Sequence, residues 1–239
     1  MRKRHGLIYH SRLHVLVTLF VVFLPFLFFL LFAEATKIAV TTLYYDVFIS
    51  IVRLGVSYII ALAFAWVIAV LFYQGRRSAI VLPIADVLQS FPTFAALPLA
   101  TLYWGVNNTT IIVFMVITVI WPILFSIISS LKLIKHEWRE AVEMSGLRGF
   151  EYVRYFLFPV TLPGIVTGSI IGLGDGWEAI VGTEIIVGIR TGLGGFFEKF
   201  STNPTITFFG IAGLLLIIFA INKIIWLPLL EHSHTLIEE

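Results

Sequence analysis

The stretch Glu137–Pro163, EWREAVEMSGLRGFEYVRYFLFPVTLP, is the longest polar interval between the apolar segments of this chain. Its periodicity predicts a helix over His136–Ser145 with a small apolar face. That face carries Trp138, Ala141, Val142 and Ser145. Gly146 is expected to end the helix, since glycine readily adopts the left-handed backbone of a helix C-terminus.

A second helical run, Phe150–Phe158, should lead from this helix to Pro159. Pro163 follows and suits the first turn of the next helix. The interval therefore predicts a helix–glycine–helix elbow beside a membrane, with an apolar face turned outward. An amphipathic connector that lies on lipid headgroups is the alternative interpretation.

The composition indicates an integral membrane protein. Of the 239 residues, 59% are hydrophobic and 13% charged, and the mean hydropathy is +0.99. Soluble domains are nearer half apolar and a quarter charged. The chain contains no cysteine, which excludes disulfides and thiolate metal ligands.

Apolar segments long enough to cross a bilayer predict six transmembrane helices. In chain order they are Val15–Ala33, Val47–Tyr73, Ala79–Gly105, Thr109–Leu131, Val160–Gly188 and Thr207–Lys223. The third contains three prolines and is expected to be a short interfacial helix followed by a span. Glu34–Asp46 is expected to be a polar link, and Ile224–Leu230 an interfacial tail.

The first apolar segment has two interpretations. A basic start, an apolar run and the sequence Ala33-Glu34-Ala35 are compatible with a cleaved signal peptide. The run is longer than a usual signal core, however, so we expect a retained first transmembrane helix.

The basic residues predict the orientation, because cytoplasmic loops are enriched in lysine and arginine. Eleven fall on the side of the elbow: Arg2, Lys3, Arg4, Arg12, Arg76, Arg77, Lys132, Lys135, Arg139, Arg148 and Arg154. Only Lys37, Arg190 and Lys199 fall on the other side. The elbow and both termini are therefore expected in the cytoplasm.

The fifth span combines small and acidic residues. Glycines recur every four residues at Gly164, Gly168, Gly172 and Gly176, a spacing that lets membrane helices approach closely. The same span carries Asp175, Trp177, Glu178 and Glu184. Acids at membrane depth usually face protein or water. These side chains are expected either to line a translocation path or to tie neighbouring helices together.

The elbow resembles the cytoplasmic EAA loop of ABC importer permeases. The residues that carry the resemblance are Glu140, Ala141, Gly146, Pro159, Leu162 and Pro163. The third position of the motif is Val142 where the family has alanine. The resemblance implies that the elbow is a coupling helix, which sits in a groove of a separate ATP-hydrolysing subunit.

Further residues are similar to the branch of this family that imports nitrate, sulfonates, taurine and related small solutes. The similarity includes Ser50–Leu54, Pro83 to Pro98 with Trp104-Gly105, Gly172-Leu173-Gly174 with Trp177 and Glu184, and Gly192-Leu193-Gly194. It extends over roughly Phe48–Phe219. A single membrane domain is expected over 1–239, with its core at 48–219 and the coupling loop at 132–158.

The resemblance also implies partners. A second permease subunit would complete the pore, two ABC ATPase subunits would dock on the elbows, and an extracytoplasmic solute-binding protein would dock on outer loops including Arg190–Pro204. No nucleic-acid partner is expected. An ion-coupled secondary transporter that uses Asp175 and Glu178, a channel, and a membrane enzyme or scaffold are the alternatives.

Catalytic and cofactor motifs are missing from the sequence. No P-loop motif G-x-x-x-x-G-K-[ST] and no H-E-x-x-H motif occurs. His232 and His234 are two tail histidines of the kind that are usually only solvated. We therefore expect no catalytic residue, no metal site and no cofactor, and ATP hydrolysis is expected in another subunit.

Overall fold

The computed structural model describes residues 7–226 and 228–229, and the described residues form helices and no strand. The helices are α1 (Leu7–Thr36), α2 (Val40–Phe72), α3 (Gly75–Gln89), α4 (Thr93–Trp104), α5 (Asn108–Lys132), α6 (His136–Ser145), α7 (Gly149–Tyr152), α8 (Phe158–Val187), α9 (Leu193–Lys199) and α10 (Pro204–Ile221). A π-helical turn, Val153–Leu157, joins α7 to α8, and another, Asn222–Trp226, follows α10. The predicted all-α class is confirmed.

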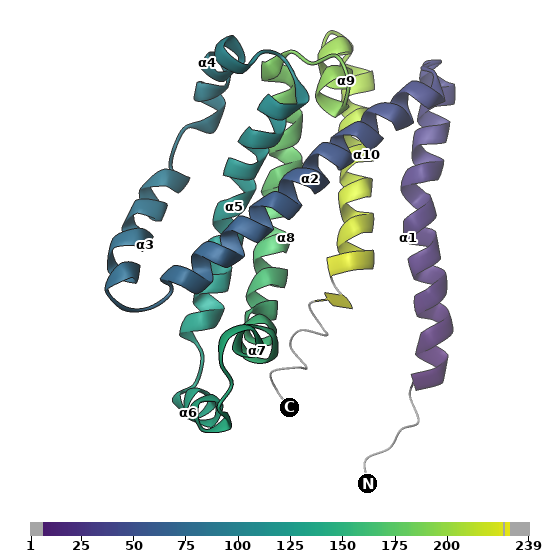
Figure 1. Cartoon of the computed structure of the whole chain (residues 1–239). Coiled ribbons are helices and arrows are strands. Elements are labelled where there is room, and N and C mark those ends of the chain that lie inside the picture. Colours follow the sequence, from purple (N-terminus) through teal and green to yellow (C-terminus); the bar gives the residue numbers. More distant parts are fainter. Residues whose placement is uncertain (1–6, 227, 230–239) are drawn as a thin grey trace.

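Five of the described helical segments are long and apolar enough to cross a membrane. They cover 17–36, 40–72, 108–132, 149–187 and 204–226. The helices α3 and α4 would make a sixth span together, although they meet at an angle of 81°. Figure 1 shows this pair carrying the chain from the lower end of α2 back to the upper end of α5. The prediction of a polytopic protein with a broken third span agrees with this arrangement.

Both predicted boundaries of the link between the first and second spans are wrong. The link expected at Glu34–Asp46 is only the turn Lys37–Ala39, because α1 runs to Thr36 and α2 begins at Val40. Asp46 is a buried helical residue whose carboxylate accepts a hydrogen bond from the Gly192 N–H at 3.0 Å. A polar residue with a partner inside the protein does not mark a loop, which is why the polarity of this segment misled the prediction.

The core lies where α2 crosses α5 and α8 (Figure 1). Ala61, Ala65 and Ala69 of α2 are fully buried, and these small side chains permit close approach of neighbouring helices. Large side chains of α5, among them Ile123 and Ile127, fill the centre. The helices α1 and α10 pack beside this core (Figure 1).

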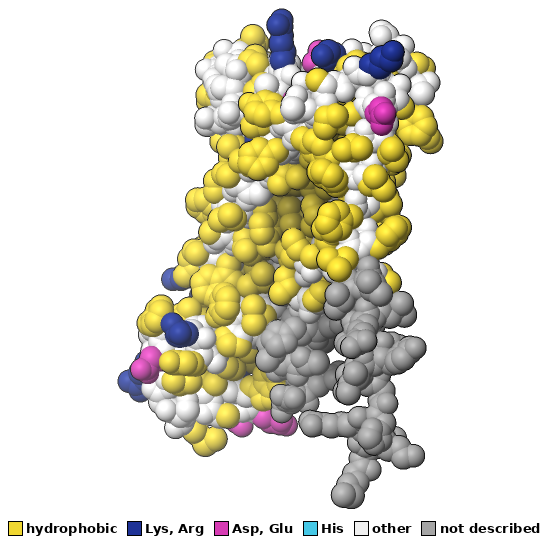
Figure 2. Space-filling model, turned by 90° about the vertical axis from the view of Figure 1, so that its right-hand side faces the viewer, with side chains coloured by type: hydrophobic (Ala, Val, Ile, Leu, Met, Phe, Trp, Pro, Cys, Tyr) yellow, Lys and Arg dark blue, Asp and Glu magenta, His cyan; other side chains and the backbone are white. Residues whose placement is uncertain are grey.

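The surface shows an apolar belt between two charged ends. Figure 2, which views the side of the molecule where α1 lies, shows hydrophobic side chains covering the middle and charged side chains gathered above and below. A bilayer core is about 30 Å thick, and this belt is the surface that it would cover. The upper end holds α4 and α9, and the lower end holds α6 (Figure 1).

Both ends of the described chain lie at the same end of the bundle as the elbow. The first turn of α1 and the last turn of α10 point to the lower end in Figure 1. An even number of crossings agrees with this placement. Which side of the membrane this end faces stays a prediction, and the predicted features at Arg2, Lys3, Arg4, His232 and His234 lie outside the described residues.

Candidate functional site

The first half of the elbow forms as predicted. The helix α6 runs from His136 to Ser145 and begins after Lys135, whose backbone is extended. Gly146 follows with φ of 72°, the left-handed conformation in which glycine avoids the clash that a Cβ would make. None of the residues of α6 is buried, so the helix stands away from the core.

The residues of the face predicted to be apolar lie in two environments, one packed against the bundle and one exposed. Trp138 and Val142 are half-buried and pack against the core of their own chain. Ala141 is exposed, and the Met144 side chain is 83% exposed. The apolar surface that α6 offers outward is therefore centred on Ala141 and Met144, whereas Val142 holds the helix to the bundle.

A polar contact also holds α6 to the end of α2. A cavity of about 290 Å³ lies between them, lined by Tyr73, Gln74, Arg139, Val142, Glu143, Leu147, Tyr152 and Phe156. With its amide oxygen turned toward the elbow, Gln74 accepts hydrogen bonds from the Arg139 guanidinium at 2.7 and 2.9 Å. Glu140 does not join this contact. It forms an exposed ion pair with His136, with 3.1 Å between Nδ1 and Oε1.

The second half of the elbow differs from the prediction. The run Phe150–Phe158 is not a separate helix, because the helical backbone continues from Gly149 through α8 to Val187. Pro159 lacks the N–H that would close an α-helical turn. The turn ahead of it widens instead, and the Phe158 N–H donates to the Val153 carbonyl. Pro163 likewise lies inside α8 and does not begin a new helix.

The glycine stripe of α8 packs against α5, as the spacing predicted. A Cβ added at Gly164 would lie 2.9 Å from the Ile127 Cα, and one added at Gly168 would lie 2.7 Å from the Ile123 Cα. Gly172 approaches the Val119 carbonyl in the same way. From Gly164 to Gly172 the stripe is therefore a backbone contact that leaves no room for larger side chains, whereas a Cβ at Gly176 would lie 2.8 Å from the Leu54 side chain of α2.

Glu184 belongs to a buried polar cluster at the end of α8 that lies opposite the elbow. Its side chain is fully buried and forms an ion pair with Arg53 of α2, with 2.6 Å between Nη1 and Oε1. The Ser50 hydroxyl lies 2.8 and 2.9 Å from the two carboxylate oxygens. The Gly194 N–H donates to Oε2 at 2.8 Å. The acids of this span were expected either to line a translocation path or to tie neighbouring helices together. Glu184 makes contacts of the second kind.

The same cluster fixes the loop after α8. Arg53 donates to the Thr191 carbonyl at 2.8 Å, to the Thr191 hydroxyl at 2.9 Å and to the Asn108 side chain at 3.0 Å. The Leu193 N–H donates to the Ser50 hydroxyl at 2.8 Å. Side chains from α2 thus satisfy buried donors of the loop, and at the end of the bundle opposite the elbow α2, α5 and α8 are joined with the start of α9. The roles of Asp46, Thr191 and Asn108 in this cluster were not predicted.

Asp175 and Glu178 open into different cavities. Both side chains are exposed in the single chain. Asp175 lines a cavity against α5 and the bend between α3 and α4, whereas Glu178 lines one against α10. Their spacing of three residues had suggested one common face, but the helices that surround α8 place them in separate hollows.

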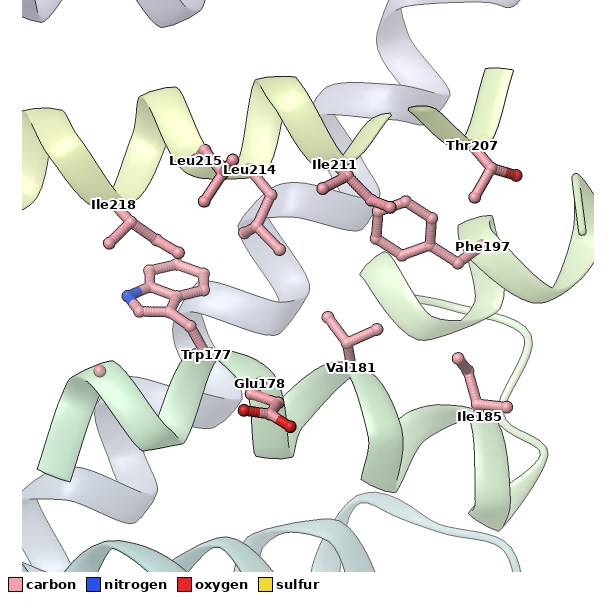
Figure 3. A pocket seen from close by; sticks show the side chains of 11 residues that line it. Trp177, Glu178, Val181, Ile185, Phe197, Thr207, Ile211, Leu214, Leu215 and Ile218 are labelled. Carbon is pink, nitrogen blue, oxygen red and sulfur yellow. The ribbon is translucent and has the colours of Figure 1, made fainter. Parts of the chain in front are cut away.

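Trp177 lies on the α10 side and closes an apolar cavity of about 420 Å³. Figure 3 shows Trp177 and Val181 extending from α8 toward Ile218, Leu214 and Ile211 of α10. The Trp177 side chain is buried. Its position indicates a packing role between α8 and α10.

Metal ligands do not gather anywhere in the part of the chain that the structure describes. Within residues 7–226 and 228–229, no group of three or more histidine, cysteine, aspartate or glutamate side chains could hold a metal ion. The polar sites are thus the elbow, the Glu184 cluster and the Asp175 cavity.

The sequence profile of the family described as "Binding-protein-dependent transport system inner membrane component" matches residues 61–225. The chain belongs to this family. The match covers α5, the elbow, α8 and roughly the last third of α2, and it confirms the resemblance that the elbow residues indicated. Membership places the chain among transport permeases of a membrane and not among enzymes.

Curated relatives give the same assignment. The nitrate import permease protein NrtB of Synechocystis sp. is 30% identical over 181 residues, which are 72% of this chain and 65% of that protein. The taurine transport system permease protein TauC of Escherichia coli is 30% identical over 112 residues, 47% of this chain and 40% of that protein. The bicarbonate transport system permease protein CmpB of Synechococcus elongatus is 25% identical over 182 residues, 73% and 66% of the two chains. The chain thus spans less than two thirds of the length of the first two relatives.

Proposed function

We propose that this chain is the transmembrane permease subunit of an ATP-driven importer of a small solute. The observation that carries the proposal is the elbow. A short helix stands outside the core with Ala141 and Met144 exposed, within a family whose description names binding-protein-dependent transport. Exposed apolar side chains on a protruding helix suit a partner with a complementary groove.

The proposed partners follow from the two ends of the bundle. An ABC ATPase subunit docks on α6, a second permease subunit completes the pore, and an extracytoplasmic solute-binding protein docks on the loops around α9. Closure of the ATPases moves α6, and the helix that continues from Gly149 into α8 carries that movement into the membrane. The names of the relatives give nitrate, taurine and bicarbonate as their solutes. We propose that the solute of this chain is of similar size.

The proposed orientation has the elbow and both termini in the cytoplasm. It rests on the excess of basic residues at the lower end, and the test is cysteine labelling in a chain that has no native cysteine. Glu151→Cys should react with impermeant reagents only from the cytoplasmic side, and Thr202→Cys only from outside. Labelling of Glu151→Cys in intact cells would refute this topology.

The test of the coupling role is Ala141→Asp, which places a charge in the proposed contact. A buried charge without a partner is strongly unfavourable, so the ATPase should no longer co-purify with the solubilised permease. Gly146→Val should act similarly by straining the left-handed turn. Ala141→Ser is the matched control and should retain the ATPase. If Ala141→Asp keeps both the ATPase and solute-stimulated hydrolysis, the elbow is only a lipid-facing connector.

An ion-coupled transporter is the competing function. It would use Asp175 and Glu178 together, but these side chains line different cavities, which does not favour a shared ion site. Uptake that collapses with an uncoupler while cellular ATP is clamped would overturn the ATP-driven proposal.

A further inference from the structure

A polar cavity lies at the bend of the broken span. It has a volume of about 230 Å³ and opens between α5, α8 and the junction of α3 with α4. Its lining is Gln89, Phe91, Thr93, Ile117, Thr118, Trp121, Pro122 and Asp175. Pockets for drug-sized ligands hold roughly 300–1,000 Å³, so this cavity suits a smaller solute.

The charged group of the cavity is Asp175. It stands twelve residues before the end of α8 at Val187, which places it about 18 Å along the helix axis from that end. In a bilayer core about 30 Å thick this is near the middle. An acid at that depth requires water or a polar partner, and among the described residues no cationic side chain forms an ion pair with it.

A backbone acceptor adds to the negative character beside Asp175. Pro122 lies inside α5 and cannot donate the helical hydrogen bond to the Thr118 carbonyl, four residues earlier. This carbonyl, like the carboxylate, accepts hydrogen bonds and favours a cation.

The bend between α3 and α4 adds no net pole to the cavity. The helix α3 ends there at Gln89 and α4 begins with Thr93. The negative end of one helix dipole and the positive end of the other therefore lie together and offset one another. Asp175 is the charged side chain that lines the cavity.

We propose that this cavity is a passage site for a small solute that carries an ammonium group, which pairs with Asp175. The inference rests on the proposed importer function and narrows its substrate class to amine-bearing solutes. Simple inorganic anions lack the ammonium group and would meet the Asp175 carboxylate with unfavourable charge. A bound metal ion does not fit, because the described residues bring no three metal-ligating side chains together.

The test measures which charge the cavity admits. Thr118→Cys gives a single thiol in the full-length permease, since the chain has no cysteine. In lipid nanodiscs, the thiol is treated with aminoethyl or sulfonatoethyl methanethiosulfonate, and each rate is divided by that of a free thiol. We expect the normalised rate of the ammonium reagent to exceed that of the sulfonate reagent by about fivefold or more.

The variants assign the selectivity to one carboxylate. Asp175→Asn in the Thr118→Cys background should bring the two normalised rates together, and Asp175→Glu should restore the difference. Glu178→Gln removes an acid from the same helix but from the other cavity, and it should leave the selectivity unchanged. Thr93→Cys repeats the measurement at the bend between α3 and α4 and guards against a folding defect at position 118, with a smaller preference expected there.

Three results would overturn the site: equal normalised rates, a preference that survives Asp175→Asn, or thiols at both positions that neither reagent reaches. The outcome is independent of the ATPase. Retention of the ATPase and of solute-stimulated hydrolysis by Ala141→Asp would refute the importer while leaving the selectivity intact. Loss of selectivity with normal ATPase binding would refute this site alone.

Discussion

The two ends of the bundle are held together in opposite ways. At the end opposite the elbow, which we propose as the outer end, a fully buried ion pair between Arg53 and Glu184 fixes the loop from Thr191 to Gly194 through side chains and backbone N–H groups. At the end that carries the elbow, the proposed inner end, α6 has no buried residue. Its attachments are the half-buried Trp138 and Val142 and the contact between Arg139 and Gln74.

This difference indicates where the molecule can move. Opening the outer end would leave charged groups unpaired inside the protein, which is expensive. Displacing α6 exposes only two half-buried apolar side chains and one accessible polar contact. An element that must respond to a partner is drawn from the less stable part of a structure, so the inner end is the part suited to transmit a signal.

The largest effect should come from breaking the outer cluster. Arg53→Met leaves Glu184 buried without its cation, and loss of one member of a buried pair costs about 3–5 kcal/mol. Stability against denaturing detergent should fall accordingly, and hydrogen exchange at the Gly192 to Gly194 amides should accelerate. The double variant Arg53→Met with Glu184→Leu should recover part of the loss. If Arg53→Met is as stable as the parent, the ion pair does not stabilise the outer end, and the contrast between the two ends of the bundle is wrong.

The next effect concerns the helix contact that joins the two ends. Gly168→Leu inserts a side chain where a Cβ would already lie 2.7 Å from the Ile123 Cα. Overpacking costs about 1–3 kcal/mol, measured by the same detergent denaturation. Gly174→Leu on the same helix is the control, because nothing lies within 4 Å of its Cβ position. Equal effects at the two positions would mean that close packing on α5 is not the cause.

A smaller and local effect is expected at the turn of the elbow. Gly146→Ala places a Cβ at φ of 72°, which costs about 1–2 kcal/mol. The cost should appear as faster hydrogen exchange in the last turn of α6, with little change in global stability. Asn tolerates this conformation better, so Gly146→Asn should be milder. A global loss as large as that of Arg53→Met would show that the inner end is not loosely attached.

The smallest effect should be that of His136→Gln. It removes the ion pair with Glu140, whose two side chains are 84% and 60% exposed. Exposed pairs contribute little to stability, so denaturation and ATPase co-purification should match the parent. A measurable loss of co-purification with normal stability would instead identify His136 as part of the docking surface.

Local features of the fold were predictable because single residues dictate them. A glycine after an amphipathic run ends a helix whatever surrounds it, and this places α6 and Gly146 correctly. Glycines at four-residue spacing require a close neighbour, and the stripe on α8 has one. The neighbour itself, α5, was not predictable, because the spacing describes only one of the two surfaces.

Features that depend on partners far apart in the sequence could not be predicted from it. Arg53 and Glu184 are 131 positions apart, so their pairing cannot be deduced from local patterns. A basic and an acidic residue, each inside an apolar span, were nevertheless a signal that the two charges needed partners. The start of the fifth span was misjudged because Pro159 and Pro163 suggested that the helix of Phe150–Phe158 ends before the span begins, although the helical backbone continues from Gly149 into the span. The coupling role of Glu140 and Ala141 stays a prediction.

The continuity of α8 has a mechanical consequence. The contact with α5 extends at least from Gly164 to Gly172, about 12 Å along the axis of α8. A helix held over that length cannot pivot independently of its neighbour. The end of α8 beyond this contact is also joined to α2 through Glu184. Tilting α8 must therefore swing α2 and α5 with it, and the three helices turn as one block.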